Sequence, residues 1–191
     1  MHRIVSTVAL VLLAGFAVAC NSKAPAQAAL QAAEQAVAGV RGDAKAFVPD
    51  QFKALEADLA DARSKFEAGE YQAALEVAQG LPAKAQEVAS AVSARRTELS
   101  QTWTEMQGSL PGMVEQAQAR LAELTKMRRL PPGLDKATVD AAQTNLAAAT
   151  EQWKDATAAM DGGDLIKAVE AAREVKSKTE AILSSLTPAA S

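Results

Sequence analysis

The sequence predicts an all-α protein, and two observations carry that prediction. Alanine, the residue with the highest helix propensity, is the commonest residue, whereas β-branched residues are sparse and aromatic residues make up only 4% of the chain. Apolar side chains also recur at alternating spacings of three and four residues, which line one helix face and are typical of coiled-coil-like seams. We therefore expect an elongated antiparallel bundle of about six helices.

Helix-breaking residues divide the chain into the segments that should form these helices. Clusters of glycine and proline separate long intervals that have a helical apolar period. Asp50, Asp135 and Asp164 each precede such an interval, where a short carboxylate accepts hydrogen bonds from the free N–H groups of a first helical turn. The expected helices cover residues 25–41, 50–68, 70–107, 111–129, 135–161 and 164–186.

A repeat with an offset of 94 residues relates two parts of the chain. The matching segments are Phe66-Glu-Ala-Gly69-Glu70-Tyr71-Gln-Ala-Ala74 and Met160-Asp-Gly-Gly163-Asp164-Leu165-Ile-Lys-Ala168. Gly69 and Gly163 are expected to take the left-handed conformation that ends one helix. The acidic residue after each glycine is expected to cap the next helix. The sequence therefore predicts two related halves, at about 27–108 and 109–187.

This Gly-acid-apolar turn, followed by an alanine three residues later, resembles the hairpin of tetratricopeptide-like repeats. It also resembles an element of uncharacterised helical lipoproteins of bacterial envelopes. The offset of 94 residues departs from the spacing of about 34 residues in tetratricopeptide arrays, so a superhelical peptide groove is not expected. The resemblance implies an interaction role and no reaction.

The N-terminal residues have the layout of a secretion signal. The apolar run at 4–16 is too short for a membrane span of about 20 residues, and small residues follow it. Ala17-Val18-Ala19 fits ordinary signal cleavage, and the same residues with Cys20 resemble a lipobox, the recognition site of lipoprotein signal peptidase. Cys20 is the only cysteine, and an unpaired exported thiol is open to oxidation, so the lipobox interpretation is favoured.

The resemblance to lipoproteins implies domain limits and an address. Residues 1–19 are expected to be a signal peptide cleaved between Ala19 and Cys20, and Cys20 to carry the lipid. Residues 20–26 are expected to hold this lipidated cysteine and a tether, 27–187 the helical domain, and 188–191 a flexible tail. Because Asn21 rather than Asp follows the cysteine, the resemblance implies the periplasmic face of the outer membrane for a Gram-negative source.

The composition excludes several chemistries from the part that follows the expected signal. The only histidine is His2 and the only cysteine is Cys20, which excludes Cys/His zinc sites, histidine-dependent nucleophiles and haem ligation by histidine. The net charge is −3 and charges of both signs are interspersed, so binding to nucleic acid is not expected. We expect no cofactor, no metal site and no enzymatic activity.

A few residues are candidates for contact with a partner. Trp103 lies just off the apolar stripe of its segment, whereas Trp153 lies on its stripe and is expected in the core. Leu130, Pro131 and Pro132 form a stiff, partly apolar loop. Each candidate also has an ordinary structural explanation, in core packing for Trp103 and in the connection of two helices for the loop.

These observations predict a membrane-anchored, non-catalytic envelope lipoprotein that serves as an interaction, adaptor or structural module, with an envelope protein as its partner. One alternative is a carrier that binds an apolar ligand such as a lipid between its helices, although tight alanine seams leave little volume for it. A more distant alternative is a carboxylate-dependent hydrolase that uses a pair such as Asp58 and Asp61, or Glu67 and Glu70.

Overall fold

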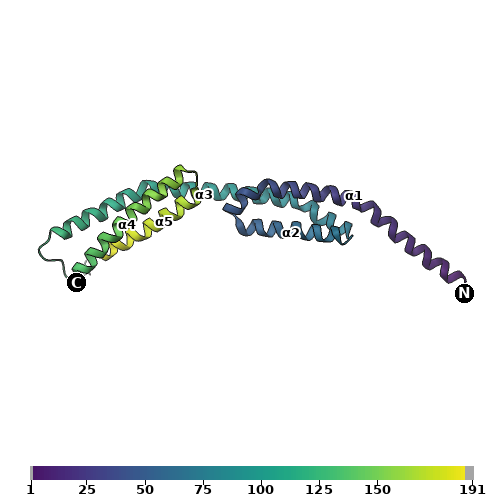
Figure 1. Cartoon of the computed structure of the whole chain (residues 1–191), viewed down its shortest axis with the longest axis horizontal. Coiled ribbons are helices and arrows are strands. Elements are labelled where there is room, and N and C mark those ends of the chain that lie inside the picture. Colours follow the sequence, from purple (N-terminus) through teal and green to yellow (C-terminus); the bar gives the residue numbers. More distant parts are fainter. Residues whose placement is uncertain (1, 188–191) are drawn as a thin grey trace. The chain divides into compact units, whose positions relative to one another are not determined.

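The computed structural model describes the backbone of residues 2–187 and the side chains of residues 22–187. Within this range the chain is helical and contains no strand, which confirms the predicted all-α class. The helices are α1 (His2–Phe47), α2 (Pro49–Glu67), α3 (Tyr71–Lys126), α4 (Lys136–Asp161) and α5 (Leu165–Ser185), as shown in Figure 1.

Several expectations concern residues at the two ends of the chain. The side chains of Ala19 and Cys20 lie outside the described residues, as does the expected tail at 188–191. Residues 22–26, part of the expected tether, belong to α1 and are therefore helical. In the described part of the chain, no helix combines the length and the apolar character that crossing a membrane would require.

The chain divides into two compact units, Met1–Arg95 and Arg96–Ser191, which we call unit 1 and unit 2. Unit 1 contains α1, α2 and the first part of α3, and unit 2 contains the rest of α3 with α4 and α5. A single long helix, α3, thus supplies core residues to both units. The predicted halves, 27–108 and 109–187, were defined by the sequence repeat and have different limits from these units, so they stay a prediction.

The core of unit 1 is built from alanine and branched aliphatic side chains. Phe52 on α2 is 1% exposed and is the aromatic residue of this cluster. Small residues let the helix backbones approach closely, which leaves little space to be filled by larger side chains. The buried cluster comprises Ala33, Val37, Ala44, Phe52, Leu55, Leu59, Ala62, Ala78, Leu81, Ala85, Val88 and Val92.

The core of unit 2 has larger aliphatic side chains near the end where α3 meets α4. Leu124 and Leu186 are at most 1% exposed, and the half-buried Leu130 and Leu134 pack against the same cluster. The buried cluster there comprises Val114, Ala117, Leu121, Leu124, Val139, Ala142, Leu146, Ile182 and Leu186.

The expected helices 70–107 and 111–129 are one helix in the structure, so the described residues hold five helices rather than about six. The predicted break at Gly108–Gly112 is wrong because α3 continues through it. Proline costs about 3 kcal/mol in a helix interior and each glycine about 1 kcal/mol. Met106, Leu110 and Val114 are buried on the same stretch, and full burial of each such side chain contributes about 1.5–3 kcal/mol, which offsets that cost.

The expected break at Gly39–Pro49 narrows to one residue, Val48, between α1 and α2. Val48 is the N-cap of α2 and has no side-chain cap, so the prediction that Asp50 caps this helix is wrong. Pro49 occupies the first helical position, where its missing N–H removes one group that a cap would otherwise satisfy. Asp50 instead lies within the first turn, where its charge suits the positive end of the helix dipole.

The other two predicted caps are confirmed. The Asp135 carboxylate accepts a hydrogen bond from the backbone N–H of Thr138 at 2.7 Å, at the start of α4. The Asp164 carboxylate accepts one from the backbone N–H of Lys167 at 3.1 Å, at the start of α5. Each satisfies a donor that the first turn of a helix leaves without an intrahelical partner.

Candidate functional site

The two turns of the sequence repeat have the same backbone geometry. Gly69 has a φ of 82° and Gly163 a φ of 83°, in the left-handed region that favours glycine. The N–H of each glycine donates to the carbonyl three residues back, on Phe66 at 3.1 Å and on Met160 at 2.9 Å. The N–H of the next residue donates to the carbonyl five residues back at 2.9 Å in both turns. This is the Schellman arrangement that closes a helix, as the glycines predicted.

The buried positions of the two hairpins also correspond at the offset of 94 residues. Ala74 and Ala168, directly after the turns, are both fully buried. There are two exceptions: Leu59, which is 4% exposed, corresponds to the half-buried Trp153, and the buried Val169 corresponds to the half-buried Leu75. Further buried pairs are Phe52 and Leu146, Leu55 and Ala149, Ala62 and Ala156, Ala78 and Ala172, Leu81 and Val175, Ala85 and Thr179, Val88 and Ile182, and Val92 and Leu186.

The side chains that close the two turns differ. In unit 1 the rings of Phe66 and Tyr71 meet edge to face, with centroids 5.2 Å apart. The ammonium group of Lys23 on α1 lies 5.6 Å from the centre of the Tyr71 ring, within the range of a cation–π contact. In unit 2 the corresponding positions hold the aliphatic residues Met160 and Leu165. Unit 1 therefore has an aromatic contact at its turn that also involves α1.

Trp103, a candidate for partner contact, is only 5% exposed and lies in the interior of unit 2. Its ring stacks on that of Trp153 from α4, with centroids 5.5 Å apart and an angle of 19° between the planes. The seam of α3 passes through Leu99, Trp103 and Met106, so the tryptophan lies on the stripe rather than off it. This burial favours the packing interpretation of Trp103, and Trp153 is the more exposed of the pair.

The predicted contact loop lies in the connection between α3 and α4. Leu130 is half-buried against the unit 2 core, Pro131 is half-buried, and Pro132 is exposed. The N–H of Leu134 donates to the carbonyl of Pro131 at 3.1 Å. Gly133 has a φ of 85°, so Pro132 and Gly133 occupy the central positions of a type II turn, which suits both residues. The loop is thus tied to the core on one side and presents Pro132 to solvent.

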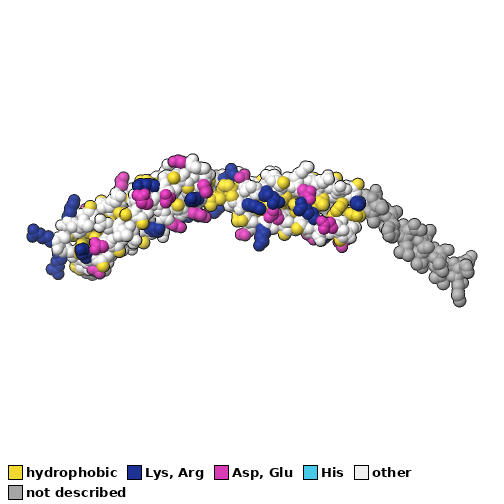
Figure 2. Space-filling view, viewed as in Figure 1, with side chains coloured by type: hydrophobic (Ala, Val, Ile, Leu, Met, Phe, Trp, Pro, Cys, Tyr) yellow, Lys and Arg dark blue, Asp and Glu magenta, His cyan; other side chains and the backbone are white. Residues whose placement is uncertain are grey.

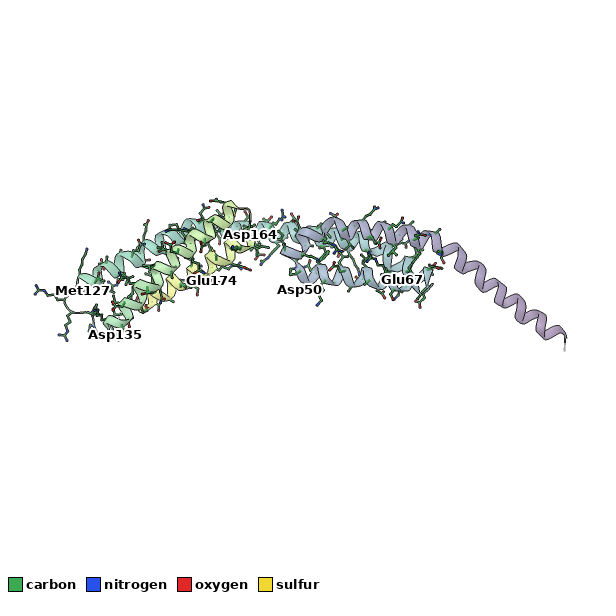
Figure 3. All side chains as sticks on the ribbon, viewed as in Figure 1. Asp50, Glu67, Met127, Asp135, Asp164 and Glu174 are labelled. Atoms are coloured by element: carbon green, nitrogen blue, oxygen red, sulfur yellow. The ribbon has the colours of Figure 1, made fainter. Side chains whose placement is uncertain are left out.

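Positively charged side chains surround this loop. We define the cationic tip as Lys126, Arg128, Arg129 and Lys136, all of which are exposed. Lys and Arg side chains gather at this end of unit 2 in Figure 2. Figure 3 labels Met127 and Asp135 at the same end.

Asp135 is the acidic residue nearest to these cations in the sequence, and it is engaged locally. Its carboxylate accepts hydrogen bonds from both the hydroxyl and the backbone N–H of Thr138, at 2.6 and 2.7 Å. The Thr138 hydroxyl and then its N–H hold the pKa of Asp135 below its ordinary value, because they favour the ionised form.

Of the acidic pairs considered for hydrolysis, Asp58 and Asp61 lie on α2 and form ion pairs, and Glu67 and Glu70 are exposed at the turn between α2 and α3. Asp58 accepts from the ammonium of Lys84 at 2.6 Å, and Asp61 from that of Lys65 at 2.5 Å. The hydrogen bond that Lys84 donates to Asp58 raises the pKa of Lys84, and the one that Lys65 donates to Asp61 raises the pKa of Lys65. Among residues 22–187, no three His, Cys, Asp or Glu side chains cluster as metal ligands would.

Surface grooves run between the helices of each unit. One, of about 510 Å³, lies between α2 and α3 and includes Leu55, Val88 and Lys84 in its lining. Another, of about 530 Å³, lies between α4 and α5. A third, of about 580 Å³, adjoins the α3–α4 loop, with Leu124, Met127, Leu130, Leu134 and Val139 as its apolar lining.

Comparisons of the chain with protein-family models, with curated proteins and with solved structures gave no match.

Proposed function

We propose that this protein is a membrane-anchored, non-catalytic lipoprotein of the bacterial envelope that serves as an adaptor or structural module for an envelope protein. The observation that carries the proposal is the pair of equivalent turns at Gly69 and Gly163. They build two helical hairpins whose backbone hydrogen bonds correspond residue by residue. Duplicated helical hairpins of this kind resemble the units of proteins that present helix faces to partners.

The proposal includes a relation between two halves of the chain. Its support is that the buried positions of α2 and early α3 correspond to those of α4 and α5 at one constant offset. A chance match of alanine-rich helices would not align large residues such as Phe52 with Leu146 and Leu81 with Val175 as well. The alternating spacings of three and four residues along α3 support coiled-coil-like seams within each half.

The anchor is proposed from the sequence around Cys20. Ala26 is the first fully buried residue among those described, so the core of unit 1 begins a few residues after the cysteine. Attachment of lipid at Cys20 would therefore require no rearrangement of that core. Two or more acyl chains make such an anchor durable, because each buried CH₂ contributes about 0.8 kcal/mol.

A non-catalytic role is supported by how the carboxylates are used. Asp58 and Asp61 are partnered by lysines on exposed faces, and Asp135 and Asp164 cap helices. These acids therefore have structural partners that account for their positions.

Cross-linking in cells tests the partner. Cross-linked wild-type protein should yield one envelope protein reproducibly by mass spectrometry, and Cys20→Ala should lose both that cross-link and its membrane association after a high-salt wash. The proposed anchor would be overturned if Cys20→Ala stayed in the membrane fraction after that wash and an inhibitor of lipoprotein signal peptidase left wild-type processing unchanged. A specific hydrolase or transferase activity in purified protein would overturn the non-catalytic role.

A further inference from the structure

Within residues 22–187, the cationic tip gathers four cations that have no ion-pair or hydrogen-bond partner for their side chains. In the described part of the chain, none of its four cations takes part in an ion pair or a side-chain hydrogen bond. Many other cations are partnered, as shown by Arg63 with Glu34 at 2.7 Å and by Lys84 with Asp58 at 2.6 Å. Clustered like charges repel one another, so an anionic ligand would relieve a repulsion that the fold itself leaves in place.

The balance of charge at this end of unit 2 is positive. Residues 126–140 carry four cations and two acids, whereas the whole chain has a net charge of −3. Of the two acids, Asp135 is committed to the two hydrogen bonds from Thr138. Asp140 lines the groove beside the loop. The cations therefore form a local positive patch on an acidic protein.

An apolar side chain lies in the middle of this patch. Met127 is 45% exposed and is the one large hydrophobic residue exposed to this degree among residues 22–187. Met127 also lines the groove of about 580 Å³, together with other apolar residues and Arg128, Arg129 and Lys136. An apolar group flanked by cations is the arrangement that binds at the boundary between lipid headgroups and acyl chains.

The backbone holds this arrangement in place. The type II turn at Pro132 and Gly133, the Asp135 cap and the packing of Leu130 and Leu134 all restrain the loop. The cations thus extend on long side chains from a restrained backbone, and little backbone entropy is lost on binding.

We propose that the cationic tip, with Met127, binds the anionic surface of a phospholipid membrane. The proposal goes beyond the adaptor function and does not depend on the anchor at Cys20. A folded acidic protein is the less suitable partner, because stable protein interfaces bury about 800 Å² on each side and rely on aromatic and arginine anchors in pockets. The tip offers one exposed methionine and long, exposed charged side chains, which suit a fluid surface of phosphates.

Vesicle co-sedimentation tests the proposal with a chain that begins at Ser22. This chain keeps every buried residue of the described cores, the first of which is Ala26, and it lacks Cys20 and the apolar run before it. It should bind vesicles of phosphatidylcholine mixed with phosphatidylglycerol and not vesicles of phosphatidylcholine alone. Binding should weaken as added salt shortens the Debye length, which is about 10 Å at 0.1 M.

A matched pair of variants distinguishes the tip from general charge. The triple variant R128Q/R129Q/K136Q should bind about 100-fold more weakly, because each cation near an anionic surface contributes about fivefold. The control K53Q/K167Q/R173Q removes the same charge at exposed positions outside the tip and should retain binding within about threefold. Equal losses in both variants would overturn the proposal, provided that both show the circular dichroism of the parent chain.

A fluorescent label reports where the vesicle touches. The chain from Ser22 has no cysteine, so Met127→Cys places one environment-sensitive dye at the tip and Gln101→Cys places one on α3 away from it. Mixed vesicles should shift the emission of the dye at 127 to the blue and leave that at 101 unchanged. If the tip bound soluble polyglutamate but not vesicles, the proposal of a membrane ligand would be overturned. The result would indicate an acidic polypeptide as the ligand instead.

Discussion

The two units have equivalent turns and equivalent buried positions, but different side chains hold their helices together. In unit 1, ion pairs join different helices, such as Arg63 with Glu34 at 2.7 Å and Arg41 with Glu56 at 3.2 Å. In unit 2, ion pairs such as Lys154 with Glu151 lie within one helix.

Contacts between the helices of unit 2 come from other groups. The rings of Trp103 and Trp153 stack between α3 and α4. The amide of Gln152 on α4 bonds to Glu174 and to Lys178 on α5. The comparison teaches that a common backbone arrangement tolerates different surface contacts. An exposed ion pair contributes at most about 1 kcal/mol to the free energy of unfolding, whereas burial of a large apolar side chain contributes more.

Removing a large core side chain should have the largest effect on either unit. Phe52→Ala should lower the free energy of unfolding of unit 1 by about 3–5 kcal/mol, because it leaves a cavity in a well-packed core. Its counterpart Leu146→Ala should lower that of unit 2 by about 2–5 kcal/mol. Denaturant titration measures the total decrease in the free energy of unfolding. Hydrogen exchange measured peptide by peptide shows which unit has lost stability. Equal loss of protection in both units would show that they unfold together.

Replacement of the two tryptophans should lower the free energy of unfolding by different amounts, because the two side chains are buried to different extents. Trp103→Ala should cost about 3–5 kcal/mol, whereas Trp153→Ala should cost less because the Trp153 ring is only half-buried. Thermal unfolding of both variants measures the order. A larger cost for Trp153 would contradict the assignment of Trp103 to the interior of unit 2.

The turn glycines come next. Gly69→Ala and Gly163→Ala should each cost about 1–2 kcal/mol from left-handed backbone strain alone, since a Cβ at either position meets no atom within 4 Å. Gly80→Ala, at a helical position that is equally open, is the matched control and should stabilise the protein by about 0.5–1 kcal/mol. Similar costs at 69 and 163 would support equivalence of the two turns, and a cost at only one would argue against it.

Salt should produce a smaller difference. Because the cross-helix ion pairs of unit 1 are exposed, raising the salt concentration should weaken unit 1 more than unit 2. Glu34→Gln should remove part of that sensitivity at a cost of at most about 1 kcal/mol. Hydrogen exchange at two salt concentrations measures the effect, and a stronger response in unit 2 would reverse the comparison.

The smallest effects concern pH, and they have opposite directions in the two units. The folded pKa of Asp135 is lowered, so its cap stabilises unit 2 above the ordinary carboxyl pKa and is lost as pH falls through the folded value. The pKa values of Lys65 and Lys84 are raised above 10.5, so their contribution to unit 1 is present below that pH and is lost as pH rises through the folded values. Exchange at acid and alkaline pH checks both directions. Asp135→Asn should flatten the acid response of α4, and an unchanged response would exclude this cap as its source.

Part of the candidate site could be predicted from the sequence, and part could not. The Gly69 and Gly163 turns and the Asp135 and Asp164 caps were predictable, because each involves residues only a few positions apart. The burial of Trp103 was not predicted, because strict alternation of three- and four-residue spacings from Val92 through Leu99 to Met106 reaches position 102 instead. The pair Arg128-Arg129 could be read from the sequence. That the cations of the tip lack ion-pair partners could not, because this depends on which acidic side chains lie nearby in space.

The sequence by itself determined the all-helical class, the two glycine turns and the caps of α4 and α5. These features follow from propensity, backbone sterics and hydrogen bonds within one turn of helix. Only the tertiary structure decided that α3 continues through Gly108 and Gly112 and that Trp103 is buried. Those outcomes depend on apolar surface buried against distant segments, whose free energy exceeds the local preferences that the sequence displays.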